Sequence, residues 1–76
     1  MLRLAAERKR LGLSQLEISR RTKMAPSDVS RIESGRFRPY QGQLHRLARA
    51  LGWRISDAQK LLDEVETSLE DGRRGA

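Results

Sequence analysis

The stretch SQLEISRRTKMAPSDVSRIESG, residues 14–35, constrains the fold most, because two helix starts and a helix end fall within it. Ser14 and Glu17 have the S-x-x-E spacing of a capping box, in which the serine hydroxyl accepts from the backbone amide three residues later. Pro26 suits the first position of a helix, where its missing N–H needs no partner. Gly35 can adopt the left-handed conformation that often follows a helix. The stretch therefore predicts two short helices joined by a tight turn, the second beginning at the proline.

The second of these helices has two distinct faces. Val29 and Ile32, three residues apart, point toward a core together with Met24. Serines on the opposite face would let the helix approach the floor of a DNA major groove, and an arginine fork matches guanine O6 and N7. An ordinary solvated helix face could have the same composition. The residues on this opposite face are Pro26, Ser27, Ser30, Arg31 and Ser34.

Three further helices are expected around this pair. The first covers residues 2–11, and a fourth begins near Gln41 and carries a core stripe at the i, i+3, i+4 and i+7 spacing. A fifth should follow a second capping box at Ser56 and continue to residue 69. The stripe of the fourth helix is Leu44, Leu47, Ala48 and Leu51, and that of the fifth is Ala58, Leu61, Leu62, Val65 and Leu69.

Charge is unevenly distributed along the 76 residues, which carry a formal net charge of +6. Residues 1–54 contain 13 Lys and Arg against 4 Asp and Glu, whereas residues 55–76 contain 3 against 6. A basic half of this kind attracts phosphates, although acidic membranes and proteins attract it too. The chain has no cysteine, which excludes disulfides and thiolate zinc sites and fits a reducing cytoplasm. No apolar run approaches the roughly 20 residues needed to cross a bilayer. We therefore expect a cytoplasmic protein that makes no membrane contact.

Several spaced motifs together resemble the Cro and phage-repressor (XRE-type) helix-turn-helix family. They are GLSQ-x-EI at 12–18, VSRIE-x-G at 29–35, the proline at 39, and L-x-RLARALG at 44–52. The resemblance covers residues 4–53 and implies an all-α, five-helix lambda-repressor-like DNA-binding domain. It also implies a transcriptional regulator that binds a pseudo-palindromic operator in double-stranded DNA as a homodimer. On this basis residues 1–53 form the DNA-binding core, 54–70 a candidate dimerisation helix, and 71–76 a flexible tail.

The resemblance also assigns roles to individual residues. One arginine of the first helix should pair with the glutamate near the end of the recognition helix, forming a buried ion pair between Arg8 and Glu33. Base contacts are expected from Pro26, Ser27, Ser30 and Arg31, and phosphate contacts from Gln15, Arg36 and Arg38. A small core without covalent cross-links commonly gains stability by oligomerisation. The candidate dimer contacts are Trp53, Leu61, Leu62, Val65 and Leu69.

Five positions depart from the family pattern. Ala25 replaces the usual capping serine or threonine, so the recognition helix lacks an N-cap worth about 1 kcal/mol. Lys23 replaces the usual turn glycine, and a left-handed lysine costs about 1–2 kcal/mol. Ser19 replaces a packed alanine and Tyr40 a capping serine. Pro26 has no donor to read a base, although its ring could touch a thymine methyl group.

Two alternatives to a transcriptional regulator stay open. The chain could be an antitoxin that binds a toxin protein and autoregulates its operon, or a protein-interaction module that kept the fold. An enzyme is not expected, because the sequence contains no nucleophile–His–acid set and no phosphate-cradling glycine loop. His45 lacks a second ligand at metal-binding spacing, so neither a metal nor a cofactor is expected.

Overall fold

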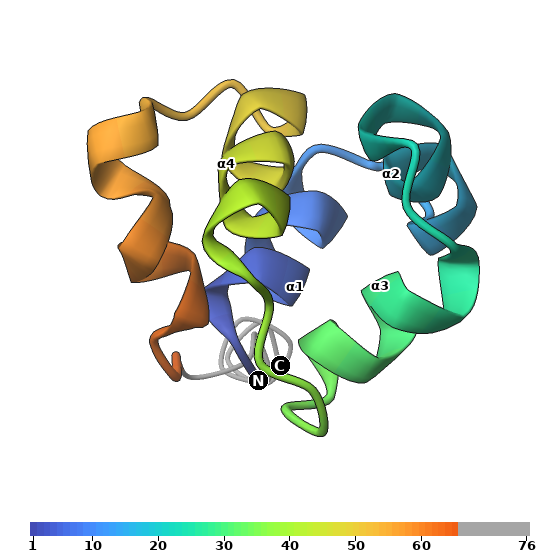
Figure 1. The fold of residues 1–76 in the computed structure, drawn as a ribbon, viewed down its shortest axis with the longest axis horizontal. Helices are drawn as coiled ribbons and strands as arrows, with labels where there is room; N and C mark the ends of the chain where they lie inside the picture. Colours follow the sequence, from blue (N-terminus) through green and yellow to red (C-terminus); the bar gives the residue numbers. More distant parts are fainter. Residues whose placement is uncertain (66–76) are drawn as a thin grey trace, which may run out of the picture.

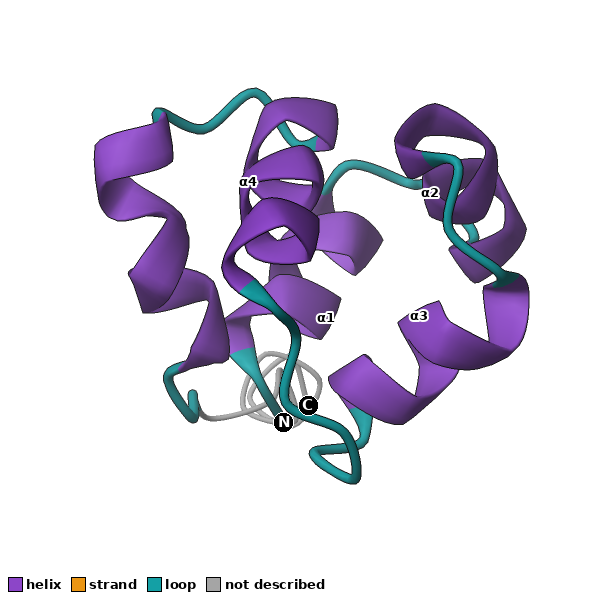
Figure 2. Cartoon of the chain, in the orientation of Figure 1, coloured by secondary structure: helices purple, strands orange, loops and turns teal. Residues whose placement is uncertain are grey.

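The computed structural model describes residues 1–65, which form four α-helices followed by a 3₁₀-helix (Figure 1). An isolated bridge between Leu2 and Glu64 is the only β-type pairing in this part of the chain, and loops connect the helices (Figure 2). The expected all-α, five-helix fold class is confirmed. In chain order the helices are α1 (Arg3–Arg10), α2 (Gln15–Thr22), α3 (Pro26–Glu33), α4 (Gln41–Ala50) and η1 (Ile55–Leu62).

Helix α4 lies at the centre of the fold (Figure 1). It packs against η1 on one side and α2 on the other, while α3 packs against α2 and α1 packs against η1. Each fully buried aliphatic side chain stabilises the fold by about 1.5–3 kcal/mol, so this shared core, rather than helix propensity, holds such short helices together. No helix in the described range is long and apolar enough to cross a bilayer. The core comprises Leu4, Ile18, Met24, Val29, Ile32, Leu44, Leu47, Ala48, Leu51, Ala58 and Leu61.

The part of the chain after α4 differs from the predicted helix. Its helix η1 is a 3₁₀-helix that ends at Leu62, and Asp63 already has extended backbone angles of φ −73° and ψ 146°. The core contacts of Ala58 and Leu61 survive, because residues i and i+3 lie on the same face of a 3₁₀-helix. The predicted continuation of the helix through Val65 is therefore wrong, and residue 69 lies outside the described residues.

The segment after η1 pairs with the N-terminus instead of continuing as a helix. The Val65 amide donates to the Met1 carbonyl at 2.8 Å, and the Arg3 amide donates to the Asp63 carbonyl at 2.8 Å. Arg3 is the first residue of α1, where backbone N–H groups have no partner within the helix, and Leu2 provides no side-chain cap. The pairing satisfies one of these amides, which gives a physical reason for the chain to leave the helix at Asp63.

Candidate nucleic-acid interface

Helix α3 presents a small, polar and basic face to solvent. Val29 and Ile32 on its other side have no exposed surface, so the helix is fixed to the core along one edge. Ser34, just after the helix, donates its hydroxyl to the Arg31 carbonyl at 3.0 Å. The four residues expected to contact bases all lie on the exposed face: Pro26, Ser27, Ser30 and Arg31.

Buried side-chain hydroxyls hold the turn between α2 and α3. Ser19 donates its hydroxyl to the Met24 carbonyl, and Thr22 donates to the Ile18 carbonyl at 2.7 Å. The Thr22 hydroxyl also accepts from the Met24 amide at 3.3 Å. Lys23 between them adopts the left-handed conformation, with φ 61° and ψ 32°. The serine that replaces a packed alanine thus gives a buried carbonyl a partner in a turn without glycine.

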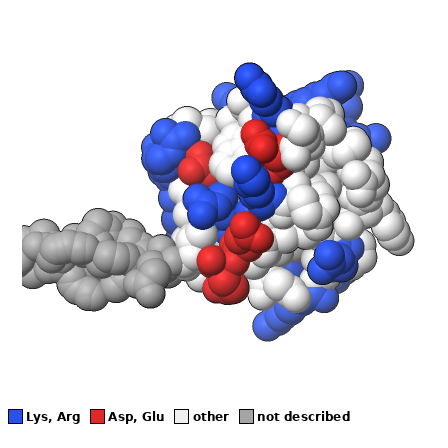
Figure 3. All heavy atoms as spheres, turned by 90° about the vertical axis from the view of Figure 1, so that its left-hand side faces the viewer, with Lys and Arg blue, Asp and Glu red and all other residues white. Residues whose placement is uncertain are grey.

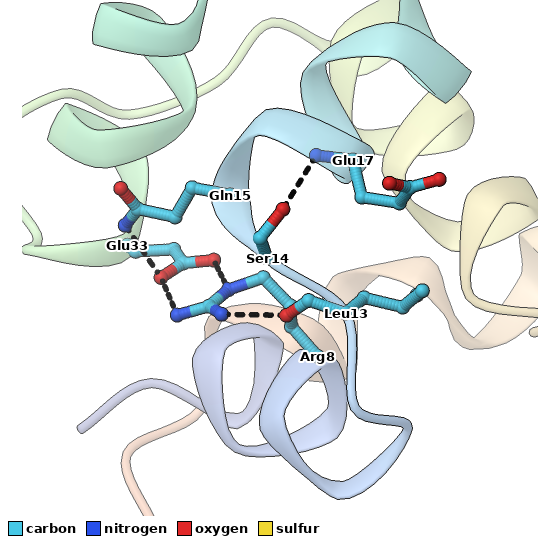
Figure 4. Close-up of polar contacts among 6 residues, drawn as sticks. All are labelled: Arg8, Leu13, Ser14, Gln15, Glu17 and Glu33. Carbon is cyan, nitrogen blue, oxygen red and sulfur yellow. Dashed lines mark hydrogen bonds and ion pairs between the residues drawn. The ribbon is translucent and has the colours of Figure 1, made fainter.

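Arg8 and Glu33 form the buried ion pair that the resemblance implies (Figure 4). Arg8 Nε lies 2.7 Å from Glu33 Oε2, and Arg8 Nη2 lies 3.0 Å from Oε1, which makes the contact bidentate. The third guanidinium nitrogen donates to the Leu13 carbonyl at 2.8 Å. Only 11% of the arginine side chain and 6% of the glutamate side chain are exposed. The pair therefore fixes the C-terminal end of α3 against α1.

The first residues of α2 connect to the same ion pair. Ser14 caps the helix by accepting from the Glu17 amide at 3.0 Å, while the Glu17 carboxylate points away from Ser14 (Figure 4). Gln15 donates from its side-chain nitrogen to Glu33 Oε1 at 3.0 Å. A carboxamide nitrogen has two N–H groups, so one of them is still available for a phosphate contact. This contact of Gln15 with the ion pair has no signal in the sequence.

The loop after α3 places two arginines beside the exposed face of that helix. Gly35 ends the helix with a positive φ of 81°, and the Arg36 amide donates to the Arg31 carbonyl at 2.9 Å. Arg36 and Arg38 are exposed, as phosphate contacts would need to be. Phe37 between them is half-buried against the core and anchors the loop.

Two residues near this face were missed by sequence reasoning. Tyr40, the residue before α4, is 71% exposed and meets Phe37 edge-to-face, with ring centroids 5.9 Å apart, so its ring lies beside the loop that carries Arg36 and Arg38. Lys9 of α1 lines the same surface hollow as Gln15 and Ser30. Tyr40 stood out in the sequence only as a replaced capping residue, and its amide is instead capped by Gln43 Oε1 at 2.9 Å.

The residues expected to form a dimer interface have mixed surroundings. Leu61 has no exposed surface, so it belongs to the core of its own chain and its assignment to a dimer interface is wrong. Trp53 and Leu62 are half-buried and pack against the same core, and Val65 is half-buried. Leu69 lies outside the described residues. The face of the molecule over η1 mixes acidic and basic side chains (Figure 3).

A model of the helix-turn-helix domain matches residues 2–60. The chain belongs to the helix-turn-helix domain family. A protein of Methanothermobacter thermautotrophicus, named an uncharacterized HTH-type transcriptional regulator, is 39% identical over 57 residues, which are 75% of this chain and 83% of that protein. No solved structure matches the chain. In this helix-turn-helix chain, the match covers α1 to α4 and the first six residues of η1.

Proposed function

We propose that this helix-turn-helix protein is a sequence-specific DNA-binding regulator of transcription, of the Cro and phage-repressor (XRE) type. The observation that carries the proposal is the exposed face of α3, which is small and basic while its opposite side is buried in the core. The bidentate Arg8–Glu33 contact supports it, because this contact holds the C-terminal end of α3 in a fixed orientation against α1. The name of the Methanothermobacter relative supports the regulatory role.

The exposed residues divide the recognition task by their chemistry. Arg31 would donate two hydrogen bonds to a guanine, and Ser27 would donate to a base edge, whereas Pro26 and Ser30 would contribute shape and methyl contacts. Gln15, Arg36 and Arg38 would bind phosphates. Phosphate contacts fix the position of a protein on the duplex and supply much of its affinity, while base contacts give specificity.

The first experiment is selection of a binding site from random duplexes, followed by titration against the selected and a scrambled site at two salt concentrations. A specific regulator should favour the selected site by about a thousandfold or more. Equal, salt-sensitive binding to both duplexes would overturn the proposal. The antitoxin and protein-interaction alternatives would then be tested by searching for a protein partner.

Two arginine variants separate base reading from phosphate binding. Arg31→Ala should cost about 1–3 kcal/mol on the selected site and relax specificity at one base pair, because it removes a bidentate contact. Arg36→Ala should weaken binding to both duplexes alike and reduce the salt dependence by about one counterion. Arg54→Ala, at an exposed position next to η1, is the matched control and should leave both affinities unchanged. Equal losses on both duplexes for Arg31→Ala would remove that residue from base reading.

A further inference from the structure

A second group of cations lies outside the exposed face of α3. It lines a shallow depression between the C-terminal ends of α2 and α4, which both lie at the top of Figure 1. The Arg21 guanidinium donates to the Ala50 carbonyl at 3.3 Å and so joins the two helix ends. We call this depression the α2–α4 basic cleft; its residues are Arg21, Thr22, Lys23, Arg46, Arg49 and Ala50.

The four cations of the α2–α4 basic cleft are not neutralised within the described part of the chain. None of the ion pairs formed by residues 1–65 involves them, and no acidic residue lines the cleft. Like charges that line one depression repel each other, because salt screens charges only in part over distances up to the Debye length of about 8 Å at physiological ionic strength. The surface is therefore suited to an anionic ligand, whose binding would relieve this repulsion.

The side chains of the cleft favour phosphates over an acidic protein. The core of a protein–protein interface is usually poor in charge and rich in aromatic residues, whereas the only uncharged residues that line the cleft are Thr22 and Ala50. Three arginines supply planar forks that match phosphate oxygens. Arg46 and Arg49, at the i, i+3 spacing on α4, are both exposed.

The cleft also includes a residue of the turn that leads into α3, whose N-terminal end would enter the DNA groove. Lys23 lies in the turn three residues before Pro26, and its left-handed backbone is held by the Ser19 and Thr22 hydroxyls. We propose that the α2–α4 basic cleft binds the phosphate backbone of DNA that flanks the half-site read by α3. This inference rests on the proposed function and extends it, because it makes the affinity depend on duplex outside the base-reading contacts.

The test compares the selected site as a minimal duplex with the same site extended by about one helical turn, roughly 10 bp, at each end. The variant is Arg46→Gln combined with Arg49→Gln. The control, Arg54→Gln combined with Lys60→Gln, removes the same charge from exposed positions at η1. Circular dichroism and unfolding midpoints of all three proteins verify that the folds are equal.

Wild type and control should bind the extended duplex about tenfold or more tightly than the minimal one. The cleft variant should match wild type on the minimal duplex and lose this gain. Its salt slope on the extended duplex should fall by about two per protomer, since each phosphate contact releases about 0.9 counterion. The inference is overturned if flanking DNA adds no affinity, if the control loses the gain equally, or if the cleft variant is equally weak on both duplexes. If the proposed function itself were wrong, the result would differ: the wild type would bind the selected and the scrambled site with equal affinity.

Discussion

Arg8 and Glu33 form the ion pair whose disruption should destabilise the fold most. Because both side chains are nearly buried, removing one leaves the other without its partner in a region of low dielectric constant. Glu33→Ala should therefore lower the free energy of unfolding by about 3–5 kcal/mol, measured by urea denaturation. The double variant Arg8→Met/Glu33→Leu should lose much less, since it leaves no unpaired charge. A loss below about 1 kcal/mol for Glu33→Ala would show that water solvates Arg8 at little cost.

Lys23 should show a conflict between stability and DNA binding. Its left-handed backbone costs about 1–2 kcal/mol relative to glycine, and glycine returns part of that gain by making the unfolded chain more flexible. Lys23→Gly should therefore raise the free energy of unfolding by about 0.5–1 kcal/mol. The same change removes one cation from the α2–α4 basic cleft, so affinity for the extended duplex should fall. Unchanged or lower stability would mean that the lysine stem packs favourably on the turn.

At the scale of single residues, the sequence indicated which residues matter better than it indicated the hydrogen bonds that they form. The Arg8–Glu33 contact was expected from the resemblance, whereas the Gln15 contact to the same carboxylate depends on three helices meeting and has no local signal. The Ser19 hydrogen bond was also not predicted, because the sequence does not show which carbonyl of the turn lies within reach of its hydroxyl.

The ends of some helices are determined by residues nearby in the sequence, whereas the end of η1 is determined by a contact with a distant segment. Capping and glycine signals placed α2, α3 and α4 within about a residue or two of their observed bounds. The end of η1 could not be found in this way. Apolar residues spaced by three fit an α-helix and a 3₁₀-helix alike, and pairing of the following segment with Met1 and Arg3 ends the helix.

Helix α1 contains a carboxylate that should link stability to pH. Hydrogen bonds from Arg10 lower the pKa of Glu7 below its ordinary value of 4.5; burial opposes this effect, and Trp53 adds to the lowering. A lowered native pKa contributes stability that is complete above pH 4.5 and is lost as the pH falls through the native value. Glu7→Gln should reduce the free energy of unfolding at about pH 7 and flatten its decline below pH 4.5. Parallel pH curves for wild type and variant, measured by urea denaturation, would contradict this role.

For the whole molecule, the distribution of apolar surface limits how two copies can meet. Ala58 and Leu61 lie on the buried side of η1 and belong to the core of a single chain. An interface between two copies at η1 would therefore rely on Trp53, Leu62 and Val65. All three are half-buried within the domain, which leaves only part of each for a partner. Sequence patterning could not resolve this division, because a core stripe and an interface stripe have the same spacing.

A homodimer on a pseudo-palindromic site should depend on the rotational phase of its half-sites. Two recognition helices related by a twofold axis reach half-sites about 10–10.5 bp apart, on one side of the duplex. Inserting about 5 bp between the half-sites turns them to opposite sides, so the affinity should fall by about tenfold or more, while an insertion of about 10 bp should restore part of it. Sedimentation of the complexes should give two protomers on the unaltered site and fewer on the half-turn insertion at equal protein concentration. Affinity independent of spacing, with one protomer per half-site, would show that the domains bind as separate monomers.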